Sequence, residues 1–589
     1  MNKRLLAFLA ILGALGFLAL CGLVAVSFFG SYSKGSLPSK ILLEADFERP
    51  IEEYMPSQPI TKAFGGDEPT TRDVVDALDR AAGDDKVAGL VARLGAVPMG
   101  LAQIQEIRDA VLRFRASGKP AVAWAETFGE FGAGNGSYYL ASAFDQIYLQ
   151  PSGDIGLTGL IYESPFIKGL FEKLDVVPRM DHRYEYKNAM NFYTESKYTE
   201  PHREAMQKLM DSQFGQIVGG IAKGRGLPEA QVRTVFNEGP YLGQQAVDAK
   251  LVDGLFYRDE VYEKVKAKAG GEAKLLYLAK YLERAGHPHE KGKKIALIYG
   301  VGAVQRGSGG FSPISGTAMG SDTVSAAFRA AREDDEVKAI VFRVDSPGGS
   351  YVASDTIWRE TQLARKAGKP VVVTMGNLAG SGGYFVAMGA DKIVAQPGTI
   401  TASIGVLGGK LLTKGFWDKL GVTYDEIHTS ENGTMFTGAQ DYTPKEWAKF
   451  QQWLDRVYLD FTSKVAEGRK LPKDKVLEIA KGRIWTGEDA LGLGLVDALG
   501  GFDVALKLAK EAAKIPAGDD VNVVIFPPKK NFFEALTQKM PDNSEGDAWA
   551  EVALELAREL RPAITMLREL GLTEQPPGVL TMPPVRTGR

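Results

Sequence analysis

The stretch Lys369–Ala390, KPVVVTMGNLAGSGGYFVAMGA, governs the interpretation of the whole sequence. Its pattern predicts a buried strand at Pro370–Met375, then a glycine-rich turn, then a helix of small residues that begins near Gly382. Ser381 lies at the junction, beside backbone N–H groups that a helix cannot satisfy internally. A serine there can be a nucleophile next to an oxyanion site, and it can equally be a plain helix cap.

The chain also carries an internal duplication with a period near 250 residues. Asp84–Leu94 resembles Asp334–Val344, and Gly224–Pro228 resembles Gly468–Pro472, in the same order along the chain. Each copy alternates Val/Ile-rich runs with helical stretches, which favours an α/β fold with buried sheets. The sequence therefore predicts two domains of one fold.

The expected division of the chain has four parts. Residues 1–35 are expected to form a membrane anchor, 45–285 the first repeat, 292–515 the second repeat, and 520–589 a helical and disordered tail. Polar residues 281–293 are interpreted as the linker between the repeats. Amphipathic helices are expected within 548–570, and the last 15 residues are expected to be disordered.

The two copies differ at the junction. Ser381 corresponds to Asn135, and both residues are flanked by glycines. The first copy instead offers Lys187, within Tyr184–Asn188, where the second copy has the small and polar Ser430–Thr434. These complementary differences suggest one composite site built from both halves.

A serine hydroxyl needs a base before it can act as a nucleophile. The chain has five histidines, His182, His202, His287, His289 and His428, and none lies in an obvious strand-end motif. A neutral lysine is the alternative, because burial can lower the pKa of its ammonium group by several units. Tyr184, Tyr186, Met190 and Phe192 are plausible walls for such a pocket around Lys187.

The N-terminal residues differ from the rest of the chain because they form a long apolar run. Leu5–Phe29 contains 25 residues without a charge, and a helix of that length spans about 37 Å, enough to cross a bilayer. Lys3 and Arg4 precede it, which places the bulk of the chain outside the cytoplasm. The only cysteine, Cys21, lies within this apolar run, so we expect no disulfide and no cysteine-ligated metal in the rest of the chain. The net charge of −3 and the absence of a basic tract argue against nucleic-acid binding.

Four motifs together resemble the signal peptide peptidase A family in its long, duplicated form. They are Asp345–Gly349 (DSPGG), Ala379–Tyr384 (AGSGGY), Thr401–Val406 (TASIGV) and Tyr186-Lys187. The resemblance covers the chain from the anchor to about residue 515. It implies a Clp/crotonase-like fold and a membrane-bound serine endopeptidase of the bacterial inner membrane, with its catalytic domains on the periplasmic side. It also implies a homotetramer and apolar signal peptides as substrates. The sequence itself shows no histidines at metal-ligand spacing other than His287 and His289 in the expected linker, and no Walker-type phosphate-binding loop, so we expect no metal and no cofactor.

Carried over to this sequence, the resemblance implies Ser381 as the nucleophile and Lys187 as the general base. Ser403 would orient the lysine, and the N–H groups of Gly382 and of Gly349 or Gly348 would form the oxyanion hole. The context Glu-Tyr-Lys-Asn-Ala departs from the family pattern, which keeps Lys197 as a fallback base. Two other functions remain open, a crotonase-like enzyme acting on acyl-CoA and a non-catalytic membrane-anchored scaffold.

Overall fold

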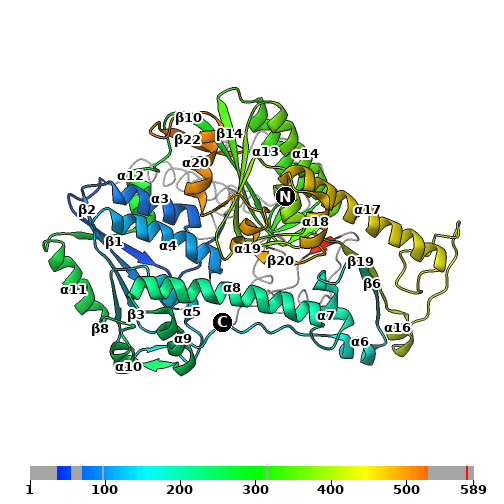
Figure 1. Cartoon of the computed structure of the whole chain (residues 1–589), viewed down its shortest axis with the longest axis horizontal. Coiled ribbons are helices and arrows are strands. Elements are labelled where there is room, and N and C mark those ends of the chain that lie inside the picture. The colour runs from blue at the N-terminus through cyan, green and yellow to red at the C-terminus, as the bar shows by residue number, and fades with distance from the viewer. Residues whose placement is uncertain (1–35, 55–68, 96–98, 313–315, 528–578, 582–589) are drawn as a thin grey trace, which may run out of the picture.

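The computed structural model describes residues 36–54, 69–95, 99–312, 316–527 and 579–581 (Figure 1). The expected anchor at 5–29 and the helices expected within 548–570 lie outside these residues. Among the described residues, no helix is both long enough and apolar enough to span a membrane.

A six-stranded sheet occupies the first half of the chain. Its order is β8-β4-β3-β2-β1-β9, and every neighbouring pair is parallel. The strands are β1 (Ile41–Asp46), β2 (Val87–Arg93), β3 (Ala121–Ala125), β4 (Gln146–Leu149), β8 (Gly254–Leu255) and β9 (Lys274–Tyr277). The helices of this half are α3 (Thr71–Ala82), α4 (Leu101–Ala116), α5 (Asn135–Ala141), α6 (Lys168–Leu174), α7 (Asn191–Thr194), α8 (Glu200–Arg225), α9 (Glu229–Glu238), α10 (Gly243–Asp248), α11 (Arg258–Lys268) and α12 (Leu278–Ala285). The central strands β1, β2 and β3 are mostly buried and rich in aliphatic residues, as expected for a parallel sheet covered by helices.

The second half repeats this arrangement. Its strands run in the order β21-β17-β16-β14-β10-β22, all parallel, which matches the first sheet position by position. They are β10 (Lys293–Val301), β14 (Val337–Ser346), β16 (Val371–Gly380), β17 (Lys392–Ala395), β21 (Ala498–Leu499) and β22 (Val521–Phe526). The helices are α13 (Ser321–Glu333), α14 (Tyr351–Lys366), α15 (Gly382–Ala387), α16 (Lys414–Lys419), α17 (Pro444–Arg469), α18 (Lys473–Ile479), α19 (Gly487–Gly492) and α20 (Phe502–Ala512). The chain is therefore an α/β protein with a duplicated sheet.

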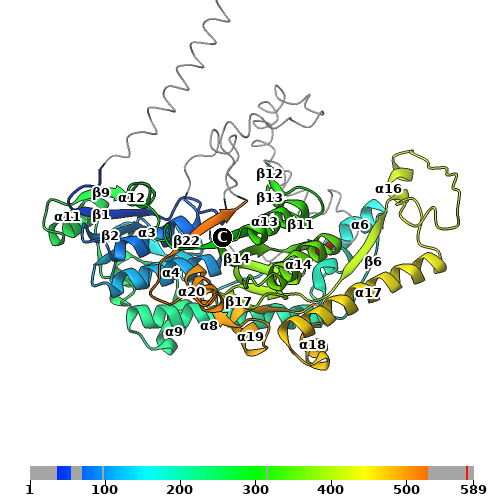
Figure 2. The ribbon, with the colours of Figure 1, turned by 90° about the horizontal axis from the view of Figure 1, so that it is seen from above.

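The two halves are joined by pairing between distant strands. β6 (Val177–His182) of the first half runs antiparallel to β19 (Leu407–Leu412) of the second, with His182 opposite Leu407. Figure 2 shows these strands at the base of an arm that also carries α6, α16 and α17. This pairing brings the segment that follows β6 into the second half.

A buried ion cluster forms a second link between the halves. Arg343 on β14 is 4% exposed, and its guanidinium contacts Glu53 at 2.5 Å and Glu106 at 2.8 Å, both from the first half. The Glu106 carboxylate also accepts a hydrogen bond from the backbone N–H of Phe502. The halves therefore share charged interior groups as well as strands.

The structure corrects three expectations about boundaries. The supposed linker begins inside α12, where Tyr281 is fully buried and donates to Asp84 at 2.9 Å. β22 adds a strand to the second sheet beyond residue 515, because Val521–Phe526 pairs in parallel with Lys293–Ile298 of β10. Within the last 15 residues, β23 (Val579–Thr581) is a strand paired with β15 (Gly348–Ser350). These elements were missed because the partners of each are far away in sequence.

Candidate active site

Ser381 occupies a strained turn between β16 and α15. Its backbone has φ 54° and ψ −114°, a conformation that a residue with a side chain rarely adopts. The turn is held by a hydrogen bond from the N–H of Ser381 to the carbonyl of Ala402, at 2.7 Å. Ser381 occupies the N-cap position, yet its side chain makes no capping hydrogen bond. The hydroxyl is thus free of the capping role that the sequence left open.

The hydroxyl of Ser381 meets Lys187 instead. The Nζ atom of Lys187 lies 2.9 Å from Ser381 Oγ, 3.0 Å from Ser403 Oγ and 3.0 Å from the Ser403 carbonyl oxygen. All three residues are fully buried. Two residues that are 194 positions apart in the chain therefore form one hydrogen-bonded pair.

The backbone around Lys187 is docked on loops of the second half. Arg183 N–H donates to the Val406 carbonyl at 2.9 Å, and Tyr186 N–H donates to the Lys481 carbonyl at 3.2 Å. A salt bridge of 3.1 Å between Glu185 and Lys481 adds to this contact. These bonds hold the segment after β6 against the second repeat.

Two glycines make room for the lysine side chain. A Cβ atom on Gly482 would lie 2.5 Å from Lys187 Cβ, and Gly482 also has a φ of 82°. A Cβ atom on Gly405 would lie 3.2 Å from Lys187 Cδ. The pocket wall is therefore the second repeat's own backbone. The expectation of local aromatic walls was wrong at Tyr184, which is 49% exposed and packs on Tyr458.

Burial changes the acidity of Lys187. Removal from water disfavours the ammonium form and lowers the pKa of Lys187 from its usual 10.5 to about 7. A substantial fraction of this lysine is consequently neutral near pH 7, with a lone pair that can accept a proton. The neighbouring hydroxyls are those of Ser381 and Ser403.

Backbone N–H groups lie next to this pair. A Cβ atom on Gly382 would lie 3.0 Å from the N atom of Gly349, so the two backbones approach closely. Gly382 is the first residue of α15, so its N–H has no intrahelical acceptor. Gly348 and Gly349 have φ values of 97° and 158°. The arrangement can direct two N–H groups at one developing oxyanion.

The first repeat has lost the equivalent chemistry. Asn135, the counterpart of Ser381, donates from Nδ2 to the Gly159 carbonyl at 2.7 Å. Its Oδ1 atom accepts from the N–H of Thr158 at 3.2 Å. The amide thus ties the turn to the neighbouring loop and offers no nucleophile.

The alternative bases lie elsewhere. Lys197 is exposed, and the His428 side chain is 47% exposed beside Glu426. His287 pairs with Asp76 at 2.9 Å. His202 is buried with both ring nitrogens unpartnered among the described residues, and burial lowers its pKa to about 4. Among the described residues, none of these side chains forms a hydrogen bond with Ser381, whose hydroxyl pairs with Lys187.

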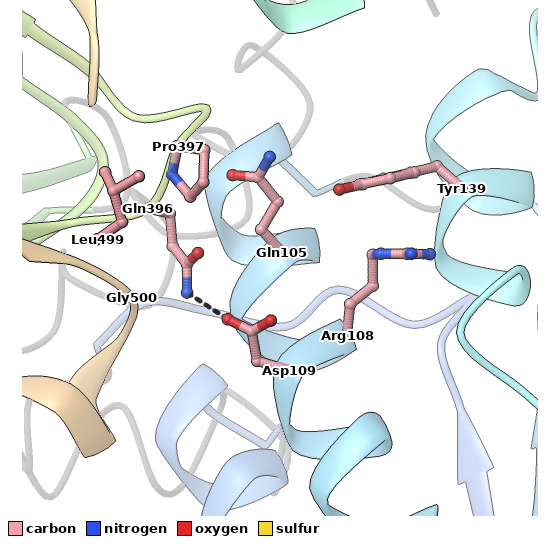
Figure 3. A pocket seen from close by; sticks show the side chains of 8 residues that line it. All are labelled: Gln105, Arg108, Asp109, Tyr139, Gln396, Pro397, Leu499 and Gly500. Carbon is pink, nitrogen blue, oxygen red and sulfur yellow. Dashed lines mark hydrogen bonds between the residues drawn. The ribbon is translucent and has the colours of Figure 1, made fainter. Parts of the chain in front are cut away.

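A cavity of about 180 Å³ lies apart from Ser381 and Lys187, between the two repeats (Figure 3). Gln396 Nε2 donates to Asp109 Oδ2 at 3.1 Å across it, and the Arg108 guanidinium stacks on Tyr139. Within the parts of the chain that the structure describes, no three His, Cys, Asp or Glu side chains gather in a way that could hold a metal ion.

Sequence reasoning missed Gly482, and it gave no role to Ala402 and Gly405 although both lie in the motif Thr401–Val406. Ala402 and Ser403 both have positive φ values, 67° and 53°, and they shape the loop that supports the Ser381 turn. A comparison of the two copies could have singled out Gly482. The first copy has Glu238 at the corresponding position, 244 residues earlier, so a glycine there is specific to the second copy.

Comparison with known proteins identifies the family to which the chain belongs. The sequence pattern of "Peptidase family S49" matches residues 113–272 and 363–516, one segment in each repeat. "Serine protease SPPA, chloroplastic" of Arabidopsis thaliana is 32% identical over 454 residues, which cover 76% of this chain and 66% of that protein. "Protease 4" of Salmonella typhi is 34% identical over 456 residues, covering 75% and 72%.

A third relative agrees with these two. "Protease 4" of Haemophilus influenzae is 31% identical over 461 residues, covering 75% of this chain and 73% of that protein. The resemblance drawn from the four sequence motifs is thereby confirmed, and neither an acyl-CoA enzyme nor a scaffold accounts for these matches. The chain belongs to peptidase family S49 and is a serine endopeptidase.

Proposed function

We propose that Ser381 is the nucleophile of this peptidase and Lys187 its general base. The observation that carries the proposal is the 2.9 Å separation between Lys187 Nζ and Ser381 Oγ, in a pocket that lowers the lysine pKa to about 7. Neutral Lys187 takes the proton of Ser381 as the hydroxyl attacks the scissile carbonyl. Lysine then protonates the leaving amine, and an acyl-enzyme remains on Ser381.

Hydrolysis of the acyl-enzyme follows with the same groups. Lys187 deprotonates a water molecule, which attacks the ester and releases Ser381. The N–H groups of Gly382 and Gly349 stabilise the oxyanion in both steps. Ser403 orients the lysine through its hydroxyl and carbonyl oxygens, each 3.0 Å from Nζ.

The substrates we propose are signal peptides and similar apolar peptides. One relative, 35% identical over 184 residues, is named "Putative signal peptide peptidase SppA" in Enterococcus faecium. We further propose that residues 5–29 anchor the chain in the bacterial inner membrane, with the catalytic domains on the periplasmic side. The apolar run and the preceding Lys3 and Arg4 support this placement.

We also propose how the chain divides into domains and how it assembles. Residues 45–285 are proposed as the Clp/crotonase-like repeat that supplies the lysine, and a second repeat that starts near residue 292 and extends through β22 (Val521–Phe526) as the one that supplies the serine. A homotetramer is proposed because large apolar side chains are exposed on the arm. They include Leu420, Val422, Tyr424, Ile427 and Phe436.

The test is peptidase activity of the full chain in detergent on a synthetic signal peptide. Ser381→Ala and Lys187→Ala should each abolish cleavage, whereas His428→Ala should leave it unchanged because that side chain lies on the exposed arm. Full activity of Lys187→Ala together with loss in His428→Ala would contradict the lysine base. Full activity of Ser381→Ala would contradict the proposed nucleophile.

A further inference from the structure

Ser346 is a fully buried serine at the end of β14, directly before the turn that carries the proposed oxyanion donor. We propose that Ser346 is a positioning residue of the peptidase reaction. Its hydroxyl binds the N–H of Gly348 and thereby directs the N–H of Gly349 at the oxyanion. This inference rests on the proposed function of Ser381 and Lys187 and adds a residue that acts through the oxyanion donor.

The Ser346 hydroxyl is used both as a donor and as an acceptor. It donates to the carbonyl oxygen of Gly302 at 2.7 Å, and it accepts the N–H of Gly348 at 3.2 Å. A serine side chain that accepts the N–H two residues ahead stabilises a local turn. Because the proton of the hydroxyl is directed at Gly302, a lone pair of the same oxygen is directed at Gly348.

The acceptor of this hydroxyl is itself held in place. The N–H of Gly302 donates to the carbonyl oxygen of Asp345 at 2.9 Å, so Gly302 is bonded to the two residues at the end of β14. Gly302 also precedes β11 (Ala303–Gln305), which pairs with β15. The hydroxyl of Ser346 therefore connects the turn to the loop that leads into the neighbouring strand.

Ser346 also lies against the backbone on both sides of the nucleophile. It stands opposite Ala379 in the pairing of β14 with β16, two residues before Ser381. Two residues after Ser381, a Cβ atom on Gly383 would lie 2.6 Å from the carbonyl oxygen of Ser346 and 3.1 Å from its Cβ atom. A change at Ser346 therefore acts at the point where the oxyanion turn and the nucleophile turn meet.

The hydrogen bond from Gly348 decides between the two glycines that the sequence left open. The N–H of Gly348 is bonded to Ser346, whereas a Cβ atom on Gly382 would lie 3.0 Å from the N atom of Gly349. Gly348 has a φ of 97°, which glycine permits but does not enforce, so the turn needs a restraint from another group. The Ser346 hydroxyl is that restraint, and it leaves Gly349 to act together with Gly382.

Loss of the hydroxyl should misdirect the donor rather than delete it. The N–H of Gly348 would be buried without its partner, and such groups rarely stay unpaired. The turn would rotate until this N–H found another acceptor, and the next peptide plane, with the N–H of Gly349, would rotate with it. Because the oxyanion charge develops only in the transition state, kcat should fall while KM stays nearly constant.

The first experiment is Ser346→Ala in the full chain, assayed on a synthetic signal peptide. We expect kcat to fall about 10- to 100-fold with KM within about twofold, somewhat less than complete removal of an oxyanion donor. Ser142→Ala is the matched control. Ser142 is equally buried, donates to the Tyr139 carbonyl at 2.8 Å and accepts from Arg108 at 2.8 Å. This control should keep the parental kcat, and equal kcat values in the two variants would overturn the inference.

The second experiment separates the transition state from substrate binding. A peptide boronate forms a tetrahedral anionic adduct on the hydroxyl of Ser381, and its inhibition constant in Ser346→Ala should rise by the factor by which kcat falls. The affinity for the uncleaved signal peptide is measured by fluorescence anisotropy in Ser381→Ala, with and without Ser346→Ala, and should be the same. An equal loss of affinity for peptide and boronate would contradict a role directed at the oxyanion.

The third experiment separates the donor from the base. The pH midpoint for reaction of Ser381 with a fluorophosphonate should stay near 7 in Ser346→Ala, because Lys187 is untouched. A displaced midpoint would mean that Ser346 acts on the base and would overturn the inference. Ser346→Cys keeps the side-chain volume with a weak hydrogen-bonding group, and it serves if the alanine variant does not fold. Parental boronate affinity in the cysteine variant would likewise overturn the inference.

The same measurements distinguish failure of this inference from failure of the proposed function. A parent chain in which Ser381 reacts with neither the fluorophosphonate nor the boronate would contradict the proposed nucleophile. A parent chain that reacts with both, together with Ser346 variants that match it in kcat and boronate affinity, would contradict only the positioning role of Ser346.

Discussion

Lys187 reaches Ser381 across a boundary between two copies of one fold, and their side-chain atoms lie 2.9 Å apart. The first copy supplies the lysine on the segment after β6, and the second supplies the serine at the end of β16. Each copy alone lacks one partner, because Asn135 replaces the serine in the first. The site therefore depends on how the two copies are docked.

Gly482 should tolerate no side chain. Gly482→Ala places a Cβ atom 2.5 Å from Lys187 Cβ and requires a φ of 82°, so Lys187 must shift away from Ser381. We expect kcat to fall by about 100-fold, because small displacements of a catalytic group are costly. Gly421→Ala is the matched control, since Gly421 has a φ of 74° but open space around it. Equal activity in both variants would contradict the packing account.

Replacing Ser403 should impair Lys187 as the general base without destabilising the fold. Ser403→Ala removes one hydrogen bond to Lys187 Nζ but keeps the bond from the backbone carbonyl. We expect kcat to fall about 10- to 100-fold, with KM little changed and the pH midpoint displaced. Ser463→Ala, whose hydroxyl donates to Leu459 and accepts from Lys473, far from Lys187 in sequence and without a bond to it, should leave both constants intact. A pure loss of stability with a parental pH profile would argue against an orienting role.

The buried lysine should make stability depend on pH. The pKa of Lys187 is about 7 in the folded chain and near 10.5 in the unfolded chain. Between these values the unfolded state binds more protons, so the free energy of unfolding rises with pH through this window. Lys187→Met should remove that rise. Denaturant titrations at pH 7 and pH 9.5 measure it, and an identical pH dependence in parent and variant would refute the low pKa.

Arg343 should be important for docking the repeats. Arg343→Met leaves the carboxylates of Glu53 and Glu106 buried without their cation, at an expected cost of about 3–5 kcal/mol. Arg329→Met is the control, because the Arg329 side chain is 48% exposed in its pair with Glu360 and should cost about 0–1 kcal/mol. Chemical denaturation compares them. Equal losses would mean that the cluster contributes no more than a surface pair.

Much of the fold could be predicted from the sequence, because its signals are local. The Val/Ile runs predict buried parallel strands, and the matches in the same order at a nearly constant offset between copies predict the duplication. The turn at Ser381 was also visible, because glycines surround it. Lys187 came from comparing the copies and from the family resemblance, since a lysine in isolation is usually a surface charge.

The remainder depended on contacts between distant segments. Nothing near Lys187 in sequence indicates that Gly482 and Gly405 enclose it, because these glycines follow almost 220 residues or more later. β22 and β23 were likewise missed, since a short apolar stretch shows no preference for a particular strand partner. The pairing of β6 with β19, which positions Lys187, is also a contact between segments that are far apart in the sequence.

The most direct test is the reaction of Ser381 with a fluorophosphonate, followed by peptide mass spectrometry over a range of pH. A fluorophosphonate reports on the activated hydroxyl without needing a chosen substrate. The label should appear on Ser381, its rate should rise with pH through a midpoint near 7, and Lys187→Met should abolish the reaction. Labelling of another serine, or an unchanged pH profile in Lys187→Met, would contradict a site shared between the two repeats.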